Sequence, residues 1–403
     1  MFPMAADAPP RPVIGISANV VDDRLTGGRI DGIGVYTRAL IGGMPAAGFA
    51  VEPVYAPSLA GIRLRPPPAG SLAFAVPLPL ATLLAAATGM PMPGARAIEA
   101  RIDLYHATDY RAPKLRRTPV VATLYDAIPH MRPEWGNPRL RRTKNVLLRA
   151  AARFADRVIV TSQAAVAEIV EHYRVPLDRI RVVPLGIDPG WFTRPAPADI
   201  RAVLAARGLS EGYFLSVGTL QPRKNYEALL RAYDRLPDAI RNERQLVIVG
   251  KYGWGAEALR AELLERRRGG RCVWLDYEDD AALRALYAGA GTFVFPTWSE
   301  GFGLPALEAL ATGLPIVASD LPVLREVVGD NAIFADPADA DALVEAMRAA
   351  VASVPEQARI DARRAQARLF SWEACARQTG AVYRELLSTS TGGERPGGGA
   401  GAI

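Results

Sequence analysis

Short apolar runs alternate with stretches of helical periodicity along most of the chain, a pattern typical of parallel α/β layers. In the first half, this pattern predicts strands over residues 12–20, 50–55, 104–107, 120–125, 157–161 and 180–184. Helices are expected between them, among others over residues 35–43, 139–153 and 164–173. The first half therefore predicts one open α/β domain.

The alternation lapses in the Pro-rich segment PGWFTRPAPADI at residues 189–200, which we interpret as a linker. A second, more regular alternation follows, with strands expected over residues 213–217, 245–249, 272–275, 292–296, 316–319 and 332–334. The helices predicted after these strands lie near residues 226–235, 255–267, 279–289, 304–312, 321–328 and 338–352. We expect an α/β protein with Rossmann-like domains over residues 1–195 and 205–370 and a ligand in the cleft between them.

The last part of the chain has two different patterns. Residues 371–388 have apolar positions at helical spacing, so we expect a final helix there. The remaining residues, 389–403, are rich in glycine without apolar periodicity and are expected to be disordered.

An apolar segment from Leu72 to Met90 is about as long as a membrane span. Pro77 and Pro79 lie inside it, so we expect a short strand or loop at LAFAV and a separate helix at LATLLAAATGM. Two interpretations stay open at this point. The segment is a buried core element, which we favour, or it exposes an apolar face to a membrane or a lipid-linked substrate.

Composition narrows the class of protein. Half of the 403 residues are hydrophobic and 22% are charged, which excludes a disordered or fibrous protein. Cys272 and Cys375 are the only cysteines, so neither a disulfide framework nor a cysteine-based zinc site is expected. The N-terminus lacks the apolar run of a signal peptide, and a cytoplasmic location fits best.

The formal net charge of +6 is unevenly distributed. Residues 101–160 hold 13 lysines and arginines against 5 aspartates and glutamates, a balance of +8. The densest part, RLRRTK at residues 139–144, would suit anionic lipid headgroups or a diphosphate-linked lipid, although it would equally suit a solvated helix. Nucleic-acid binding is not expected, because no aromatic stacking residues accompany the basic run.

One candidate binding segment is LQPRKN, which follows the predicted strand FLSVGT and precedes a helix. Gly218 permits close approach of a phosphate, and a helix start offers free N–H groups. With Arg223 and Lys224 added, the segment would suit a diphosphate, although a solvated turn with two surface cations has the same pattern.

A second candidate segment is WSEGFGLPALEALATG, after the predicted strand TFVFPT. Glu300 lies on the loop and Glu308 eight residues later on the next helix, with Gly301 and Gly303 between them. Carboxylates accept hydrogen bonds from hydroxyl groups, so the pair would suit a sugar and a ribose. Alternatively, Glu308 is an ordinary acidic residue near a helix N-terminus.

These segments together resemble the retaining glycosyltransferases of family 4, whose hallmark is the E-x7-E pattern seen here from Glu300 to Glu308. The resemblance is strong over residues 205–388, in VGTLQPRKN, VWLDYEDDAALRALYAGA, FPTWSEGFGLPALEALATGLPIVASDLPVLREVVGD and ADPADADALVEAM. It is weaker in the first half, in DGIGVYTRAL, VVATLYDAIP, ADRVIVTSQAAVAEI and IRVVPLGIDPGWF. It implies a GT-B fold: two Rossmann-like domains, acceptor on the first, nucleotide-sugar donor on the second, and a final helix crossing back to the first.

The resemblance also implies roles for individual residues. Arg223 and Lys224 would neutralise the donor diphosphate, and Glu300 would contact hydroxyls of the donor sugar. Tyr277 lies where the family reads the base, and Glu308 would hold the ribose. The full set implied for donor binding is Gly218, Thr219, Tyr277, Gly301, Phe302, Gly303, Leu304 and Glu308. Gly32 and Gly34 match a glycine loop of the first domain that approaches the diphosphate from the other side.

The chain departs from the family pattern at one position. The family often has His-Asp after a strand of the first domain, where this chain has Tyr125 and Asp126. A phenol can donate a hydrogen bond to the sugar but is a poor base at neutral pH. We count both residues as catalytic candidates, and His106, after another strand, as a further candidate that would more often be structural.

The resemblance implies transfer of a hexose from a nucleotide sugar to a saccharide or lipid-linked acceptor, without metal or other cofactor. GDP-mannose or a related GDP-sugar such as a rhamnose donor is the first expectation, in bacterial O-antigen or exopolysaccharide synthesis, at most peripheral to the cytoplasmic face of the inner membrane. The alternatives are a UDP-sugar glucosyltransferase, a GT-B epimerase or phosphorylase, and a non-catalytic nucleotide-sugar-binding protein.

Overall fold

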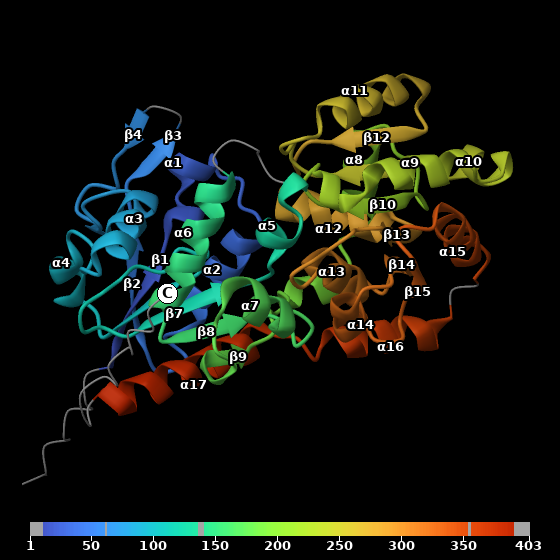
Figure 1. Ribbon diagram of the computed structural model, residues 1–403. Helices are drawn as coiled ribbons and strands as arrows, with labels where there is room; N and C mark the ends of the chain where they lie inside the picture. Colours follow the sequence, from blue (N-terminus) through green and yellow to red (C-terminus); the bar gives the residue numbers. More distant parts are fainter. Residues whose placement is uncertain (1–10, 61–62, 136–140, 354–355, 391–403) are drawn as a thin grey trace, which may run out of the picture.

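The computed structural model describes residues 11–60, 63–135, 141–353 and 356–390, and it contains two parallel sheets side by side (Figure 1). The first sheet has the order β5-β2-β1-β6-β7-β8-β9. Its strands are β1 (Val13–Ser17), β2 (Ala50–Tyr55), β5 (Leu72–Ala73), β6 (Leu104–Ala107), β7 (Val120–Leu124), β8 (Arg157–Val160) and β9 (Ile180–Val182). All neighbouring pairs in this sheet are parallel.

The second sheet is also parallel, with the order β12-β11-β10-β13-β14-β15. Its strands are β10 (Phe214–Val217), β11 (Leu246–Val249), β12 (Cys272–Leu275), β13 (Thr292–Phe295), β14 (Ile316–Ser319) and β15 (Ile333–Ala335). The order of strands reverses between β1 and β6 in one sheet and between β10 and β13 in the other. Ligands of open α/β sheets bind beyond the carboxyl ends of strands at such points.

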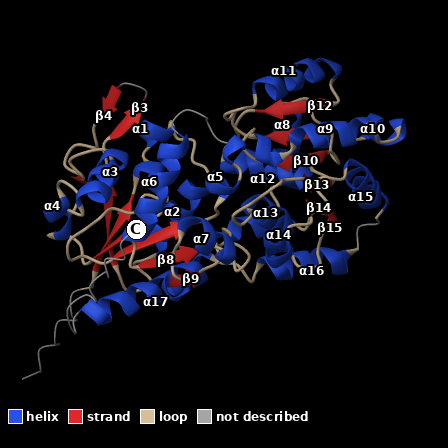
Figure 2. Ribbon diagram, viewed as in Figure 1, coloured by secondary structure: helices blue, strands red, loops and turns tan. Residues whose placement is uncertain are grey.

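Helices surround both sheets (Figure 2). Those of the first domain are α1 (Asp23–Thr26), α2 (Gly32–Gly43), α3 (Leu78–Thr88), α4 (Ala95–Glu99), α5 (Ile128–Met131), α6 (Arg141–Phe154) and α7 (Val166–Tyr173), beside a hairpin of β3 (Ser58–Ala60) and β4 (Arg63–Arg65). Those of the second are α8 (Pro197–Ala205), α9 (Tyr226–Asp234), α10 (Asp238–Glu243), α11 (Glu257–Arg266), α12 (Asp280–Gly289), α13 (Leu304–Thr312), α14 (Pro322–Val328), α15 (Ala340–Ala352) and α16 (Gln357–Ala367).

The final helix α17 (Trp372–Ser390) leaves the second domain and runs beneath the first, in red in Figure 1. There it packs against α2. Its Glu385 pairs with Arg157 of β8 at 2.7 Å and with Arg181 of β9 at 2.6 Å. The return of the last helix to the first domain, expected from the family resemblance, is therefore present.

Several segments differ from the sequence prediction; α10 and the hairpin of β3 and β4, for example, were not predicted. Residues 189–200 contain a 3-10 turn (Pro189–Phe192) and the start of α8, because Trp191 is buried and Pro197 suits the first turn of a helix. Helix α16 was not predicted, since it buries Ala367 alone and has little apolar periodicity. The tail predicted at 389–403 lies outside the described residues apart from 389–390, which are helical.

The apolar segment 72–90 folds as expected, with the short strand β5 before the Pro break and helix α3 after it. Only one face of helix α3 belongs to the hydrophobic core. Ala81 and Ala85 are buried, whereas Leu80, Leu83 and Leu84 are 44–50% exposed. The favoured interpretation as a buried element therefore holds for one face of α3 only.

Candidate active site

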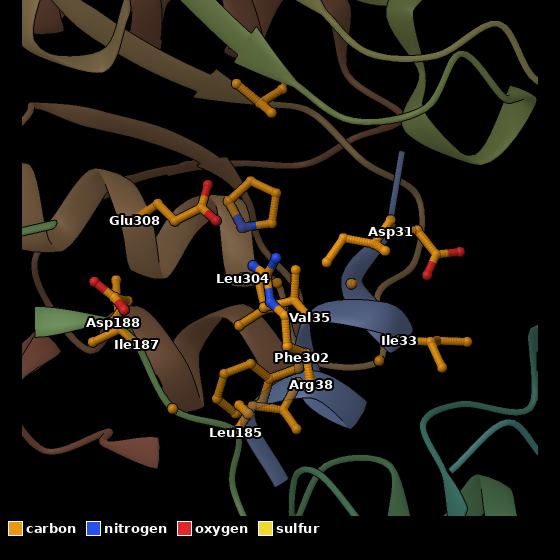
Figure 3. Close-up of a pocket in the computed structure, with 18 of the residues that line it drawn as sticks. Asp31, Ile33, Val35, Arg38, Leu185, Ile187, Asp188, Phe302, Leu304 and Glu308 are labelled. Atoms are coloured by element: carbon orange, nitrogen blue, oxygen red, sulfur yellow. The ribbon is translucent and has the colours of Figure 1, made fainter. Parts of the chain in front are cut away.

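A cavity of about 990 Å³ lies between the two domains. Figure 3 shows Asp31, Val35 and Arg38, from the start of α2, on one side, and Glu308 of α13 on the other. The cavity is bordered by loops that follow β7, β10 and β13. The cleft expected from two open sheets is therefore present, next to the reversal in strand order of the second sheet.

A cluster of three charged side chains lies in this cleft, with the side chains of Glu300 and Lys224 buried and that of Arg223 25% exposed. Glu300 Oε1 contacts Lys224 Nζ at 2.6 Å, and Glu300 Oε2 contacts an Arg223 Nη at 3.1 Å. Thr297 Oγ1 donates to Glu300 Oε1 at 2.8 Å. The two cations come from the 3-10 turn after β10 and the carboxylate from the loop after β13. Because β10 and β13 are neighbours in the sheet, both loops leave the same edge and meet.

The electrostatics of this cluster follow from burial and pairing. Burial by itself would raise the pKa of Glu300, but Lys224 and Arg223 outweigh it and hold that pKa at about 2. Burial, together with repulsion from Arg223, lowers the pKa of Lys224 to about 8. Glu300 is therefore ionised at neutral pH, and Lys224 is a cation that alkaline conditions neutralise. The alternative interpretation, a solvated turn with two surface cations, is wrong for Lys224, which is 5% exposed.

Glu308 lies on the first turns of α13 and is partly buried. Its Oε2 accepts a hydrogen bond from the Tyr287 hydroxyl at 2.9 Å. Burial raises the pKa of Glu308 to about 8, with a small opposing effect of Tyr287. Its carboxyl group is then protonated at neutral pH, so it can donate as well as accept a hydrogen bond toward a ligand hydroxyl.

The glycine loop between the two glutamates joins the domains. The carbonyl oxygen of Gly301 accepts hydrogen bonds from Thr161 Oγ1 at 3.1 Å and Ser162 Oγ at 3.3 Å. A Cβ added at Gly301 would lie 2.7 Å from the Tyr125 carbonyl oxygen. Gly303 has φ +95° and begins α13, a conformation that favours glycine. The backbone at Gly301 therefore lies so close to the first domain that a side chain would not fit there.

Tyr125 and Asp126 form part of the opposite wall. The Tyr125 hydroxyl donates to the Thr108 carbonyl oxygen at 2.8 Å, so it points into the first domain. The expectation that this phenol donates to the donor sugar is corrected, because its hydrogen is already used. Asp126 faces Arg223; burial raises its pKa and Arg223 opposes the rise.

The expectation of a catalytic His106 is also corrected. His106 is fully buried, with Nδ1 2.6 Å from the Tyr383 hydroxyl and Nε2 2.8 Å from Thr123 Oγ1. Burial lowers the pKa of His106 to about 3, so the ring is neutral at physiological pH. His106 is a core residue that holds α17 in place through Tyr383, which agrees with the expectation that a histidine in this position is more often structural.

Gly32 and Gly34 lie in the first turn of α2, where a glycine loop was expected. The Asp31 carboxylate caps this helix by accepting from the Gly34 N–H at 3.1 Å. Gly32 faces Leu304 across the cleft and lines it. Gly34 does not line it, and a Cβ there would lie 2.7 Å from the Ile30 Cβ. The glycine at 34 is therefore needed for packing.

Most of the predicted site residues line the same cleft, with Gly34 and His106 as the exceptions: the lining set contains Gly32, Tyr125, Asp126, Gly218, Thr219, Tyr277, Arg223, Lys224, Glu300, Gly301, Phe302, Gly303, Leu304 and Glu308. Sequence reasoning missed several charged or aromatic lining residues: Asp31, Arg38, Tyr110, Lys251, Asp280 and Arg284. A charged residue directly after a strand, such as Lys251 after β11, was the available signal. Within the described residues, no group of three or more metal-binding side chains is found.

Comparison with known families agrees with this geometry. The family model for "Glycosyltransferase Family 4" matches residues 30–191, and the model for "Glycosyl transferases group 1" matches residues 205–366. The O-antigen chain mannosyltransferase B of Escherichia coli is 36% identical over 287 residues, which cover 70% of this chain and 74% of the relative. The chain belongs to glycosyltransferase family 4. It is a glycosyltransferase.

Other relatives and structures support the same assignment. The serotype-specific mannosyltransferase WbdA of Escherichia coli is 32% identical over 223 residues, or 52% of this chain, which spans only 27% of that longer protein. The sucrose-phosphate synthase of Thermosynechococcus elongatus superposes with a TM-score of 0.70 at 24% identity over 94% of this chain and 100% of that one. The latter likeness concerns the fold alone, which is GT-B as expected.

Proposed function

We propose that this glycosyltransferase transfers mannose, with retention of configuration, from GDP-mannose to a saccharide or lipid-linked saccharide in bacterial surface polysaccharide synthesis. The observation on which the chemistry rests is the Arg223–Glu300–Lys224 cluster at the edge of the second sheet, in which Glu300 and Lys224 are buried. The names of the mannosyltransferase relatives support the choice of sugar and pathway.

The cluster suits departure of a nucleoside diphosphate. The bond between the anomeric carbon and the diphosphate oxygen breaks, and negative charge develops on that oxygen. Arg223 and Lys224 stabilise it in a site sheltered from water, where such interactions are strongest. We propose that the two cations make a metal or other cofactor unnecessary.

The acceptor hydroxyl attacks the same carbon from the face that the diphosphate leaves. A new carbon–oxygen bond forms, and the hydroxyl proton passes to the departing phosphate oxygen, so no side-chain base is required. This agrees with the absence of a histidine at position 125. Glu300 holds the two cations in place and accepts hydrogen bonds from the donor sugar.

A thermal-shift screen against GDP, UDP, ADP and their sugars tests the donor. A ligand that binds the native state raises the melting temperature by mass action, so at 100 times Kd the stabilisation is about 2.7 kcal/mol. We expect GDP and GDP-mannose to raise the melting temperature most. Preference for UDP would contradict the proposed donor. Epimerised nucleotide sugar in incubations without acceptor would indicate an epimerase, and binding without transfer to any acceptor a non-catalytic protein.

We further propose peripheral contact with the cytoplasmic face of the inner membrane. No helix among the described residues is long and apolar enough to cross a bilayer. However, Leu80, Leu83 and Leu84 form an exposed apolar face on α3, and α3 contacts α6. Helix α6 exposes Arg142 and Lys144. An apolar face beside cations fits an anionic lipid surface.

Flotation with vesicles tests this contact. The wild type is expected to float with vesicles containing anionic phosphatidylglycerol, and L83E/L84E to lose most of this binding because two charges enter the apolar face. L369E is the matched control, since Leu369 is 70% exposed on the second domain. Equal binding of L83E/L84E and wild type would contradict the proposed surface.

A further inference from the structure

A second pocket, outside the interdomain cleft, opens at the carboxyl ends of β1, β2 and β6. We call it the strand-end pocket; Ser17, Tyr55, Asp109, Arg111 and Pro77–Pro79 are among its lining residues. Its volume is about 120 Å³. A single water needs about 15 Å³ by the same kind of measure, so the pocket is larger than a site for one structural water.

A buried carboxylate oxygen of a residue that lines this pocket lacks a partner. The Asp109 side chain is 7% exposed, and its Oδ2 pairs with an Arg111 Nη at 3.4 Å. Its Oδ1 is buried and has no hydrogen-bond partner among the described residues. Leaving a buried polar atom unpaired is costly, and such atoms are rare in folded proteins. The carboxylate of Asp109, a residue that lines the pocket, therefore has one acceptor that no described protein group uses.

The rest of the lining defines the chemistry of a ligand that would use this acceptor. Arg111 is half exposed and can donate to a ligand oxygen, while Asp109 can only accept when ionised. A hydroxyl group, which both donates and accepts, matches this pair, whereas Arg111 disfavours a cation. The ring of Tyr55 and the Pro77–Pro79 segment offer apolar contacts. An acceptor and a donor beside an apolar wall match a sugar ring, which has polar edges and apolar faces.

The backbone connects this pocket with the cleft. Asp109 and Tyr110 are consecutive, with Cα atoms about 3.8 Å apart. Asp109 lines the strand-end pocket and Tyr110 lines the cleft. Tyr110 has φ +66°, an unfavourable conformation for a bulky residue. Such strained residues concentrate at functional sites, and here the turn lies where two consecutive residues line two different cavities.

We propose that the strand-end pocket is a second acceptor subsite, which binds a sugar unit of the acceptor chain beyond the unit that receives the new residue. This inference rests on the proposed function. It assigns Asp109 and Arg111 to recognition of acceptor hydroxyls, and it predicts preference for longer acceptors. The pocket reaches Pro77–Pro79 at the start of α3, so a lipid-linked chain bound there would lie beside the apolar face of that helix.

The test compares acceptors of one and three α-linked mannose units, each as the methyl glycoside, with GDP-mannose as donor. The wild type is expected to have a higher kcat/KM for the trisaccharide. D109N and R111A are expected to lower the ratio of the two kcat/KM values about 10-fold, because one charge-assisted hydrogen bond is lost. D330N, at an exposed position of the second domain, should leave the ratio unchanged.

A binding measurement separates this inference from the proposed function. Calorimetric titration of the trisaccharide in the presence of GDP requires no turnover, so it reports on the pocket even if mannose transfer fails. Binding by the wild type that D109N and R111A weaken supports the subsite. An unchanged ratio and unchanged binding in both variants would mean that water alone fills the pocket and would overturn it. Because Arg111 is half exposed, R111A decides the matter even if D109N does not fold.

Discussion

Replacing Glu300 by glutamine is expected to lower kcat by about 10²–10³-fold, the usual effect of removing one group from preorganised transition-state stabilisation. Glutamine keeps the size of the side chain but removes the charge that contacts Lys224 at 2.6 Å and Arg223 at 3.1 Å. Without the carboxylate, the two cations repel each other, and the pKa of Lys224, already lowered to about 8, falls further.

The pH profile gives this prediction a specific signature. Lys224 is charged below its pKa, so E300Q is expected to lose its residual activity at a lower pH than the wild type does. Loss of one partner of a buried ion pair also costs about 3–5 kcal/mol of stability. Melting curves must therefore show that E300Q is folded at the assay temperature.

Glu345 on α15 allows a matched control, because its side chain is 67% exposed. E345Q carries the same substitution and should retain wild-type kcat. A kcat for E300Q within a factor of two of the wild-type value would contradict the assignment of Glu300.

Replacing Lys224 by methionine is expected to lower kcat at least about 10²-fold, with a smaller change in KM for the donor. The Lys224 cation acts on charge that develops as the diphosphate leaves, so its loss affects the transition state more than the ground state. Methionine keeps the unbranched apolar stem but removes the ammonium group, whose Nζ lies 4.7 Å from the centroid of the Phe295 ring.

The ionisation of Lys224 should also be visible in the pH dependence of wild-type kcat/KM. The kcat/KM for the donor reports groups of the free enzyme, so it should fall as pH rises through about 8, when Lys224 loses its proton. The K224M variant should lack this alkaline limb. The control is K114M, because Lys114 belongs to the first domain and does not line the cleft. A wild-type profile that stays flat to pH 10 would contradict the role of Lys224.

Much of the fold was predictable from local pattern. Parallel strands buried on both faces are short apolar runs, and the strands of both sheets coincide with the predicted runs within a few residues. The exceptions have physical causes. Helix α16 buries one residue and so leaves no periodic signal, and the predicted strand at 12–20 ends at Ser17, where a 3-10 turn (Asn19–Val21) begins.

The composition of the site was also predictable, but its contacts were not. The E-x7-E motif and the Arg-Lys pair identify residues of the cleft from their local context. The contact between Lys224 and Glu300, 76 positions apart, depends on β10 and β13 being neighbours while β11 and β12 lie on the other side of β10. The spacing of residues along the sequence does not by itself predict the order of strands in the sheet.

The sequence by itself determined the fold class, the family and the chemical groups of the donor half, because periodicity and short motifs are local properties. Tertiary structure alone decided which side chains face the cleft. Tyr383, 277 positions away, covers His106, the Thr108 carbonyl oxygen accepts a hydrogen bond from the Tyr125 hydroxyl, and Asp109 lines a pocket separate from the cleft. These outcomes depend on hydrogen-bond partners and packing between distant segments, which exist only once the chain has folded.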